Sequence, residues 1–273
     1  MKKIIIPLFF LISSGVINAD ESQVKQNKKA PVVASSQQQL SELKLLRLTK
    51  ACVNCSFANQ DLRDLDLFQS NLTQSNLTGV RLDGSNLQEA DLTSVDLIDA
   101  ELIAAQLDYA TINHADLRGV NLERAQLRGA HLNGSDLADA NLNQANLQGA
   151  LLKGATLTNV DFTGTNLRGA HLQNADLRNA DLTTADLRGA NMQGAILTSA
   201  DLEGLDLSWV NFSHADLRDA YLTNADLSRA VIEYVNFKGA DLSGAVLGET
   251  SLKGTNLRRS RQQRECLAKD CFE

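Results

Sequence analysis

Aromatic residues and proline are scarce in this chain of 273 residues. Aromatic side chains make up 4% of the sequence, and there are only two prolines. These shortages argue against the mixed core of large side chains that an ordinary enzyme has. Hydrophobic residues nevertheless make up 43% of the chain, which excludes a disordered polymer. A few residue types, led by Leu and Ala, must supply this hydrophobic content, and such a bias indicates a repeat.

Positive charge is also in the minority. The chain has 26 Lys and Arg residues against 33 Asp and Glu residues, a formal net charge of −7. Direct binding to nucleic acid is therefore not expected, because it depends on basic side chains that displace counterions from phosphates. An acidic chain could still imitate nucleic acid, which is a separate hypothesis.

Apolar runs of any length are confined to the first residues. Two lysines precede an apolar stretch from Ile4 to Ile17, which is shorter than the ~20 residues of a transmembrane helix. Residues 1–19 are therefore predicted to be a secretory signal peptide that is cleaved after Ala19. A buried N-terminal helix is the alternative. The prediction implies an exported protein, periplasmic or extracellular in a bacterium, with no membrane span after cleavage.

One repeat accounts for most of the remaining chain. From Phe57 to Leu257 every fifth residue is large and apolar, which gives 41 consecutive positions of which 34 are Leu. The residue two places earlier is usually small and is Ala in 24 of the 41 cases, and the residue directly before the large one is often Asp or Asn. A period of five fits neither a helix nor a flat strand.

A chain that turns a corner every five residues explains this period. Four such sides close a square coil of twenty residues, with large and small apolar residues pointing inward. Successive coils would stack with strand-like hydrogen bonds about 4.8 Å apart. Gly occupies 15 of the 41 positions two after the large residue, and Gly tolerates the positive φ that some turns need.

The pattern resembles that of the pentapeptide-repeat family, A(D/N)LXX, as in Ala175-Asp176-Leu177-Arg178-Asn179. The resemblance covers about three quarters of the chain. It implies an all-β fold, a right-handed quadrilateral parallel β-helix, which would here have about ten coils. Some relatives are cytoplasmic proteins that imitate duplex DNA and protect DNA gyrase, and many others have no assigned activity. The repeat is thus a signature of the fold and does not select among functions.

Both ends of such a solenoid need a cap. We predict a flexible lead-in over 20–39, an N-terminal cap over 40–56, the solenoid over 57–257 and a C-terminal cap or tail over 258–273. A short amphipathic helix over 36–49 is expected to cover the first coil with an apolar stripe. The leucines of this stripe are Leu40, Leu43, Leu45, Leu46 and Leu48. The tail could cover the last coil or form a homodimer.

All four cysteines lie in the predicted caps. Cys52 and Cys55 are at one end, and Cys266 and Cys271 are at the other. An oxidising compartment favours one local disulfide in each pair. Cys52 and Cys55 are also in phase with the inward positions, so both could be buried thiols. A redox-active site is not favoured, because no thioredoxin-like pattern surrounds the pair.

The strict period assigns each outward residue to one of four sides. The repeat has 27 acidic and 13 basic residues, but the side of Leu72, Leu92 and Ile112 has only two of each. All four histidines lie on this nearly neutral side. We take it as the candidate docking face, with these residues: His114, His131, Leu151, His171, His214, Val231 and Tyr234. Ordinary solvated residues on a drifting repeat are the alternative interpretation.

No arrangement of residues indicates catalysis. Ser, Thr and Asp occupy interchangeable repeat positions, and there is no Gly-rich phosphate loop or metal-spaced His/Cys motif. A core of Leu and Ala leaves no enzyme-like pocket. We therefore expect no enzyme, no cofactor and no metal, but an exported structural or protein-binding scaffold with an unknown protein partner. The alternative is a DNA-mimic regulator of a type II topoisomerase, as the family resemblance suggests.

Overall fold

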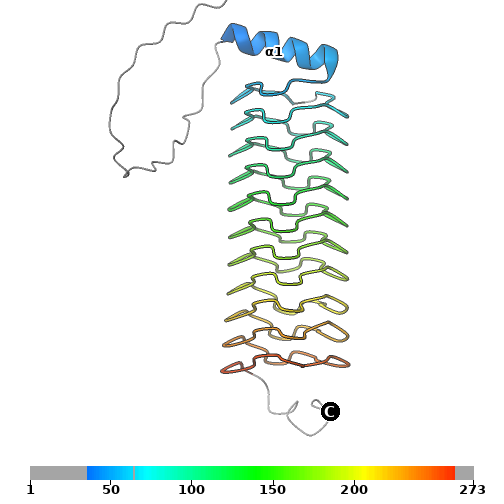
Figure 1. Ribbon diagram of the computed structural model, residues 1–273, viewed down its shortest axis with the longest axis vertical. Helices are drawn as coiled ribbons and strands as arrows, with labels where there is room; N and C mark the ends of the chain where they lie inside the picture. The colour runs from blue at the N-terminus through cyan, green and yellow to red at the C-terminus, as the bar shows by residue number, and fades with distance from the viewer. Residues whose placement is uncertain (1–35, 64, 262–273) are drawn as a thin grey trace, which may run out of the picture. The chain divides into compact units, whose positions relative to one another are not determined.

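The computed structural model describes residues 36–63 and 65–261. Within them a single helix, α1 (Ser36–Thr49), precedes a solenoid that runs to the end of the described chain (Figure 1). The predicted signal peptide, residues 20–35 of the lead-in and residues 262–273 of the tail lie outside the described residues. Cys266 and Cys271 are among the latter, so their predicted disulfide stays a prediction.

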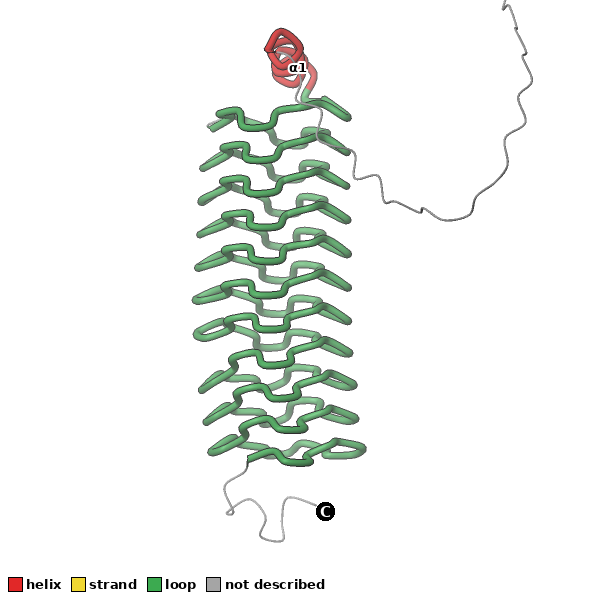
Figure 2. Tube along the Cα trace, turned by 90° about the vertical axis from the view of Figure 1, so that its left-hand side faces the viewer, coloured by secondary structure: helices red, strands yellow, loops and turns green. Residues whose placement is uncertain are grey.

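The solenoid is a parallel β-helix whose coil is twenty residues long. Parallel bridges join residue i to residue i+20, from Ala51↔Asn71 to Asp241↔Arg261. In the described chain no side is long enough to form a continuous strand, because each side contributes one bridging residue before the next corner (Figure 2). The expected fold class is confirmed. The ladder extends beyond 57–257 at both ends, because residues from Ala51 onward already follow the repeat.

Backbone hydrogen bonds between coils follow the five-residue unit. Leu72 N–H donates to the carbonyl of Asp91 (2.8 Å), and Gln74 N–H donates to that of Thr93 (3.0 Å). Ser75 N–H closes the corner by donating to the Leu72 carbonyl (3.1 Å). Because backbone N–H groups recur as donors between coils, a proline within the repeat would remove a bond, which explains why it has none.

The core consists of two kinds of column. The large residues are almost fully buried from Phe57 to Leu242, including the four phenylalanines Phe57, Phe162, Phe212 and Phe237, and only partly buried from Leu247 to Leu257. Most residues two places earlier are buried as well, and several of the polar ones donate to backbone carbonyls. Ser135 Oγ, for example, donates to the Ile112 carbonyl at 2.6 Å. Polar groups at inward positions are therefore compatible with the dry core when they have such a partner.

Asp or Asn before the large residue stabilises the corner that follows. Thr93 N–H donates to Asp91 Oδ1 (3.0 Å), and Thr73 N–H donates to Asn71 Oδ1 (3.1 Å). A short carboxylate or amide side chain that accepts from the backbone two residues ahead forms an Asx turn. The repeat consensus is thus a consequence of the corner geometry.

Helix α1 lies across the N-terminal end of the solenoid, as Figures 1 and 2 show from two sides. Leu46 is fully buried and Leu43 half-buried against the first coil, and Glu42 Oε2 accepts a hydrogen bond from Ser56 N–H (2.8 Å). The predicted helix and its capping position are therefore present. The expected single apolar stripe is wrong, however, because the other three leucines of α1 are exposed.

The first coil also contains the N-terminal cysteine pair. Cys52 and Cys55 are both buried, and their Sγ atoms lie within bonding distance with the Cα atoms 5.6 Å apart. This Cα separation is within the usual range for a disulfide. The geometry is therefore compatible with the predicted disulfide.

Candidate docking face

Four residues of the candidate docking face lie in one column on one side of the solenoid. The bridges Thr111↔His131, His131↔Leu151 and Leu151↔His171 place three of them in successive coils. Val231 continues the column through Asn211↔Val231. His131, His171 and Val231 are exposed and Leu151 is half-buried. The assignment to sides from the five-residue period thus agrees with the structure.

The remaining three residues lie at the corner that follows this side. His114, His214 and Tyr234 all have φ near +60°. The rings of His214 and Tyr234 stack in parallel, with centroids 5.0 Å apart and an interplanar angle of 4°. Lys253 Nζ lies 5.8 Å from the Tyr234 ring centroid, within cation–π range. The structure therefore brings together a ring pair near the C-terminal end of the face.

His114 is separate from that pair. Its ring lies over Gly134 of the next coil, where an added Cβ would be 2.7 Å from the imidazole Nδ1. The missing side chain at position 134 therefore makes room for the imidazole. Since His114 and His214 are 100 residues apart in a coil of twenty, they lie five coils apart.

The residues that replace Asp or Asn on this face lose the local cap of the corner. His131 and Leu151 cannot form the Asx turn. Instead, Asn133 N–H donates to Asn113 Oδ1 (2.9 Å) and Lys153 N–H donates to Asn133 Oδ1 (3.1 Å), so that an amide of the preceding coil supplies the acceptor. The departures from the consensus are thus compensated by their neighbours.

A shallow hollow of about 480 Å³ lies on the same side of the solenoid, between the His171 coil and the ring pair. The residues around it are Lys153, Gln173, Asn174, Gln193, Gly194 and His214. Only His214 was among the predicted face residues. Gly194 contributes no side chain, so the neighbouring amides form the walls. Writing the sequence in rows of twenty and comparing the residues two places after each large residue would have shown the glycines at this corner.

A second hollow, of about 320 Å³, lies at the corner that precedes the face. The chain's single tryptophan, Trp209, is 63% exposed there, and the Arg229 guanidinium lies 5.3 Å from its ring centroid. Arg229 Nε also bonds Glu249 Oε2 at 2.8 Å. An exposed Trp beside an Arg is a residue pair that is enriched in protein interfaces. The sequence interpretation missed this corner, since it followed charge and histidine.

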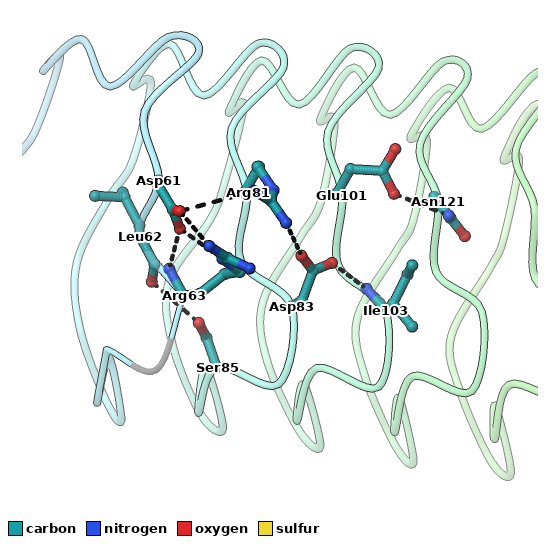
Figure 3. A network of polar contacts seen from close by, with 9 residues as sticks. All are labelled: Asp61, Leu62, Arg63, Arg81, Asp83, Ser85, Glu101, Ile103 and Asn121. Carbon is teal, nitrogen blue, oxygen red and sulfur yellow. Dashed lines mark hydrogen bonds and ion pairs between the residues drawn. The ribbon is translucent and has the colours of Figure 1, made fainter.

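The side of Leu62, Leu82 and Leu102 differs in charge from the candidate docking face. It carries ten acidic and three basic residues. Figure 3 shows its first coils, where Arg81 lies between Asp61 (3.8 Å) and Asp83 (3.6 Å). Arg63 donates to Asp61 and holds the pKa of that carboxyl at about 2. The acidic ladder is thus only partly neutralised, and the candidate docking face is a nearly neutral strip on an acidic solenoid.

The described chain contains no arrangement that indicates a metal site or a membrane span. Among the residues that the structure describes, no group of three His, Cys, Asp or Glu side chains is placed to hold a metal ion. Helix α1, the helix of the described part, is too short and too polar to cross a membrane.

A coil of four five-residue sides defines the class of right-handed quadrilateral β-helices. The sequence matches the family described as Pentapeptide repeats in eight copies, over residues 52–88, 85–124, 121–159, 135–174, 165–204 and 206–248. The chain belongs to the pentapeptide repeat family. No curated protein matches it.

Several solved structures are similar to this chain. HetL, a pentapeptide repeat protein involved in heterocyst differentiation regulation from Nostoc sp. strain PCC 7120, is 30% identical, with 80% of this chain and 94% of HetL covered and a TM-score of 0.45. QnrB1, a plasmid-mediated fluoroquinolone resistance protein, is 16% identical over 80% of this chain and 92% of its own, with a TM-score of 0.41. A further Nostoc pentapeptide repeat protein is 43% identical over 33% of this chain and 72% of its own, with a TM-score of 0.30.

Proposed function

We propose that this chain is an exported, non-enzymatic scaffold that binds a protein partner on the candidate docking face. The observation that carries the proposal is the nearly neutral strip of exposed imidazole, amide and aromatic groups on an acidic solenoid. Aromatic and arginine side chains are common anchors of protein interfaces, whereas dense like charge opposes close approach. A protein without strong positive charge would therefore bind this side in preference to the others.

Site-specific photo-cross-linking tests this proposal. A benzoylphenylalanine at Gln193, which is exposed beside the hollow, is expected to give one discrete cross-linked product in the native host. The matched control is the same residue at Glu203, which is exposed on the acidic side and should give none. The double variant His171→Glu/Val231→Glu should abolish the product at position 193. Equal products at both positions would contradict a specific face.

The export proposal has its own test. Cell fractionation with N-terminal sequencing is expected to recover the protein outside the cytoplasm, starting near Asp20. Cytoplasmic recovery with residues 1–19 intact would overturn it.

We also propose that Cys52 and Cys55 form a disulfide in the exported protein. Mass spectrometry after thiol trapping without reduction should then show both cysteines unmodified.

Regulation of a type II topoisomerase by DNA mimicry is the second candidate. One observation favours it: residues 57–257 carry a net charge of −14 on a straight stack of coils, and duplex DNA presents dense negative charge along a rod. The candidate docking face interrupts this charge along one entire side. Export would also separate the protein from a topoisomerase in the cytoplasm. We therefore place mimicry second.

A further inference from the structure

Helix α1 has leucines on two opposite faces. At 100° per residue, Leu43 and Leu46 lie on the face that packs against the first coil. Leu45 and Leu48 lie on the opposite side of the helix and are 47% and 74% exposed, and Leu40 lies at the flank between the two sides and is 68% exposed. We call these three residues the outward leucine face. α1 lies across the end of the solenoid (Figures 1 and 2) and packs Leu43 and Leu46 against it, so the exposed leucines lie on the outer surface of the cap.

An outward leucine face is unusual for a terminal cap. Capping elements of repeat proteins normally present a polar outer surface, since this surface keeps the end of the stack in solution. Here Leu43 and Leu46 already close the first coil, whereas the outward leucines remain largely exposed. Three exposed large apolar side chains between Leu40 and Leu48, a little more than two turns of helix, therefore indicate a surface that another phase or molecule covers.

The charges around this face are basic. Leu40, Lys44 and Leu48 follow one another at four-residue intervals and therefore lie in one line on the helix. Lys44 and Arg47 are exposed.

The nearby carboxylates do not cancel this charge at the face. Glu42 accepts the hydrogen bond from Ser56 N–H on the side of the coil, and Asp66 is paired with Lys50 at 2.9 Å. The outer surface of α1 thus combines exposed leucines with the exposed Lys44 and Arg47, which form no ion pair within the described residues, on a molecule whose solenoid is strongly acidic.

We propose that the outward leucine face of α1 binds an anionic lipid surface. Leucines that enter the acyl boundary and basic side chains that contact the headgroups bind membranes together, although either contribution alone is weak. The acidic solenoid would be repelled by the same surface, so the stack of coils would stand on its N-terminal end. A second copy of the chain fits less well, because Lys44 would then meet its own counterpart between two basic helices.

Vesicle co-sedimentation with the full protein purified from its host tests the proposal. We expect binding to vesicles of phosphatidylglycerol and phosphatidylcholine, little binding to phosphatidylcholine alone, and a decrease with added salt. The variant Leu45→Gln/Leu48→Gln should weaken binding at least about tenfold, since two apolar side chains no longer enter the bilayer. Lys44→Glu/Arg47→Glu should weaken it by a similar factor.

The matched control is Val246→Gln, which removes a half-exposed apolar side chain (50%) from a side of the solenoid other than the candidate docking face and should leave lipid binding unchanged. Thermal unfolding of each variant shows whether the cap is intact. Absence of binding to anionic vesicles, or binding that the α1 variants do not change, would overturn the proposal. So would a doubled mass in light scattering that the leucine variant abolishes, because a second copy would then cover the face. The assay uses lipid directly, so its outcome does not depend on export or on the docking proposal.

Discussion

The corner residue of each five-residue unit has a left-handed backbone, whatever its side chain. In the described solenoid φ at this position ranges from +52° to +79°, not only at glycines but also at Thr184 (+60°), Trp209 (+65°) and His214 (+61°). For residues with a Cβ this conformation costs about 1–2 kcal/mol each. The repeat therefore contains many small strains, which the packed Leu columns and the ladder between coils offset.

Gly84 offers a test of this strain by itself. Its φ is +66°, and an added Cβ would meet no atom within 4 Å. Gly84→Val is therefore expected to lower the free energy of unfolding by about 1–2 kcal/mol or somewhat more, through the backbone alone. Chemical denaturation measures the change. Gly84→Asn should cost less, since Asn tolerates this region, and equal costs for the two variants would contradict the explanation.

Carboxylates paired with arginine make the free energy of unfolding depend on pH in the acidic range. The Arg63 guanidinium holds the pKa of Asp61 at about 2, and hydrogen bonds from Arg178 and Arg188 lower the pKa values of Asp176 and Asp186. Because these pKa values lie below the unfolded value of about 3.9, the stabilisation is present above about pH 4. It is lost as the pH falls through the lower folded values.

We therefore expect the melting temperature to be constant near neutral pH and to decrease between about pH 4 and pH 2. Asp61→Asn should make this decrease shallower. A melting temperature that rises as the pH falls below 4 would show that relief of repulsion among the acidic residues outweighs the lost pairs.

The coil is the element of this fold, and each coil packs only against its neighbours. Stability in such a stack is close to a sum of terms for each coil and each contact between coils. The cost of a core substitution should thus depend on its position along the stack. Leu147, in the middle, is fully buried, whereas Leu252, in the last described turn, is half-buried.

Leu147→Ala is expected to lower the free energy of unfolding by about 2–5 kcal/mol, because it leaves a cavity between two coils. Leu252→Ala should cost clearly less, as its side chain already contacts solvent. Equilibrium denaturation followed by circular dichroism compares the two. Equal costs would contradict a dependence of the cost on position along the stack.

On the scale of the whole molecule, the distribution of charge separates the two candidate functions. A gyrase-protecting mimic needs negative charge on the surface that enters the DNA-binding site, but the nearly neutral side and the 13 basic residues interrupt it. We expect no protection of gyrase from a fluoroquinolone in a supercoiling assay with the purified protein. Clear protection at concentrations comparable with that of gyrase would reverse the order of the two proposals.

The period of five determines which features can be predicted from the sequence. Leu at every fifth position places the core, the corners and the sides, so the column of His131, Leu151 and His171 follows directly. The hollow beside Gln193 depends on side chains that lean over the next coil and on a glycine that leaves space. The two faces of α1 depend on how the helix meets the first coil. Such packing is not contained in a pattern of residue types.

The twenty-residue register separates what the core requires from what the surface displays. Removing or inserting five residues within the solenoid would leave every Leu pointing inward, because each side of the coil accepts the same unit. Every residue beyond that point would, however, turn by a quarter of the circumference relative to those before it. A change between His171 and His214 would therefore place His214 on a different side of the solenoid from His131 and His171. Only insertions or deletions of twenty residues, or of a multiple of twenty, change the length of the stack and keep its faces. Any other multiple of five rotates the later coils about the axis of the solenoid relative to the earlier ones.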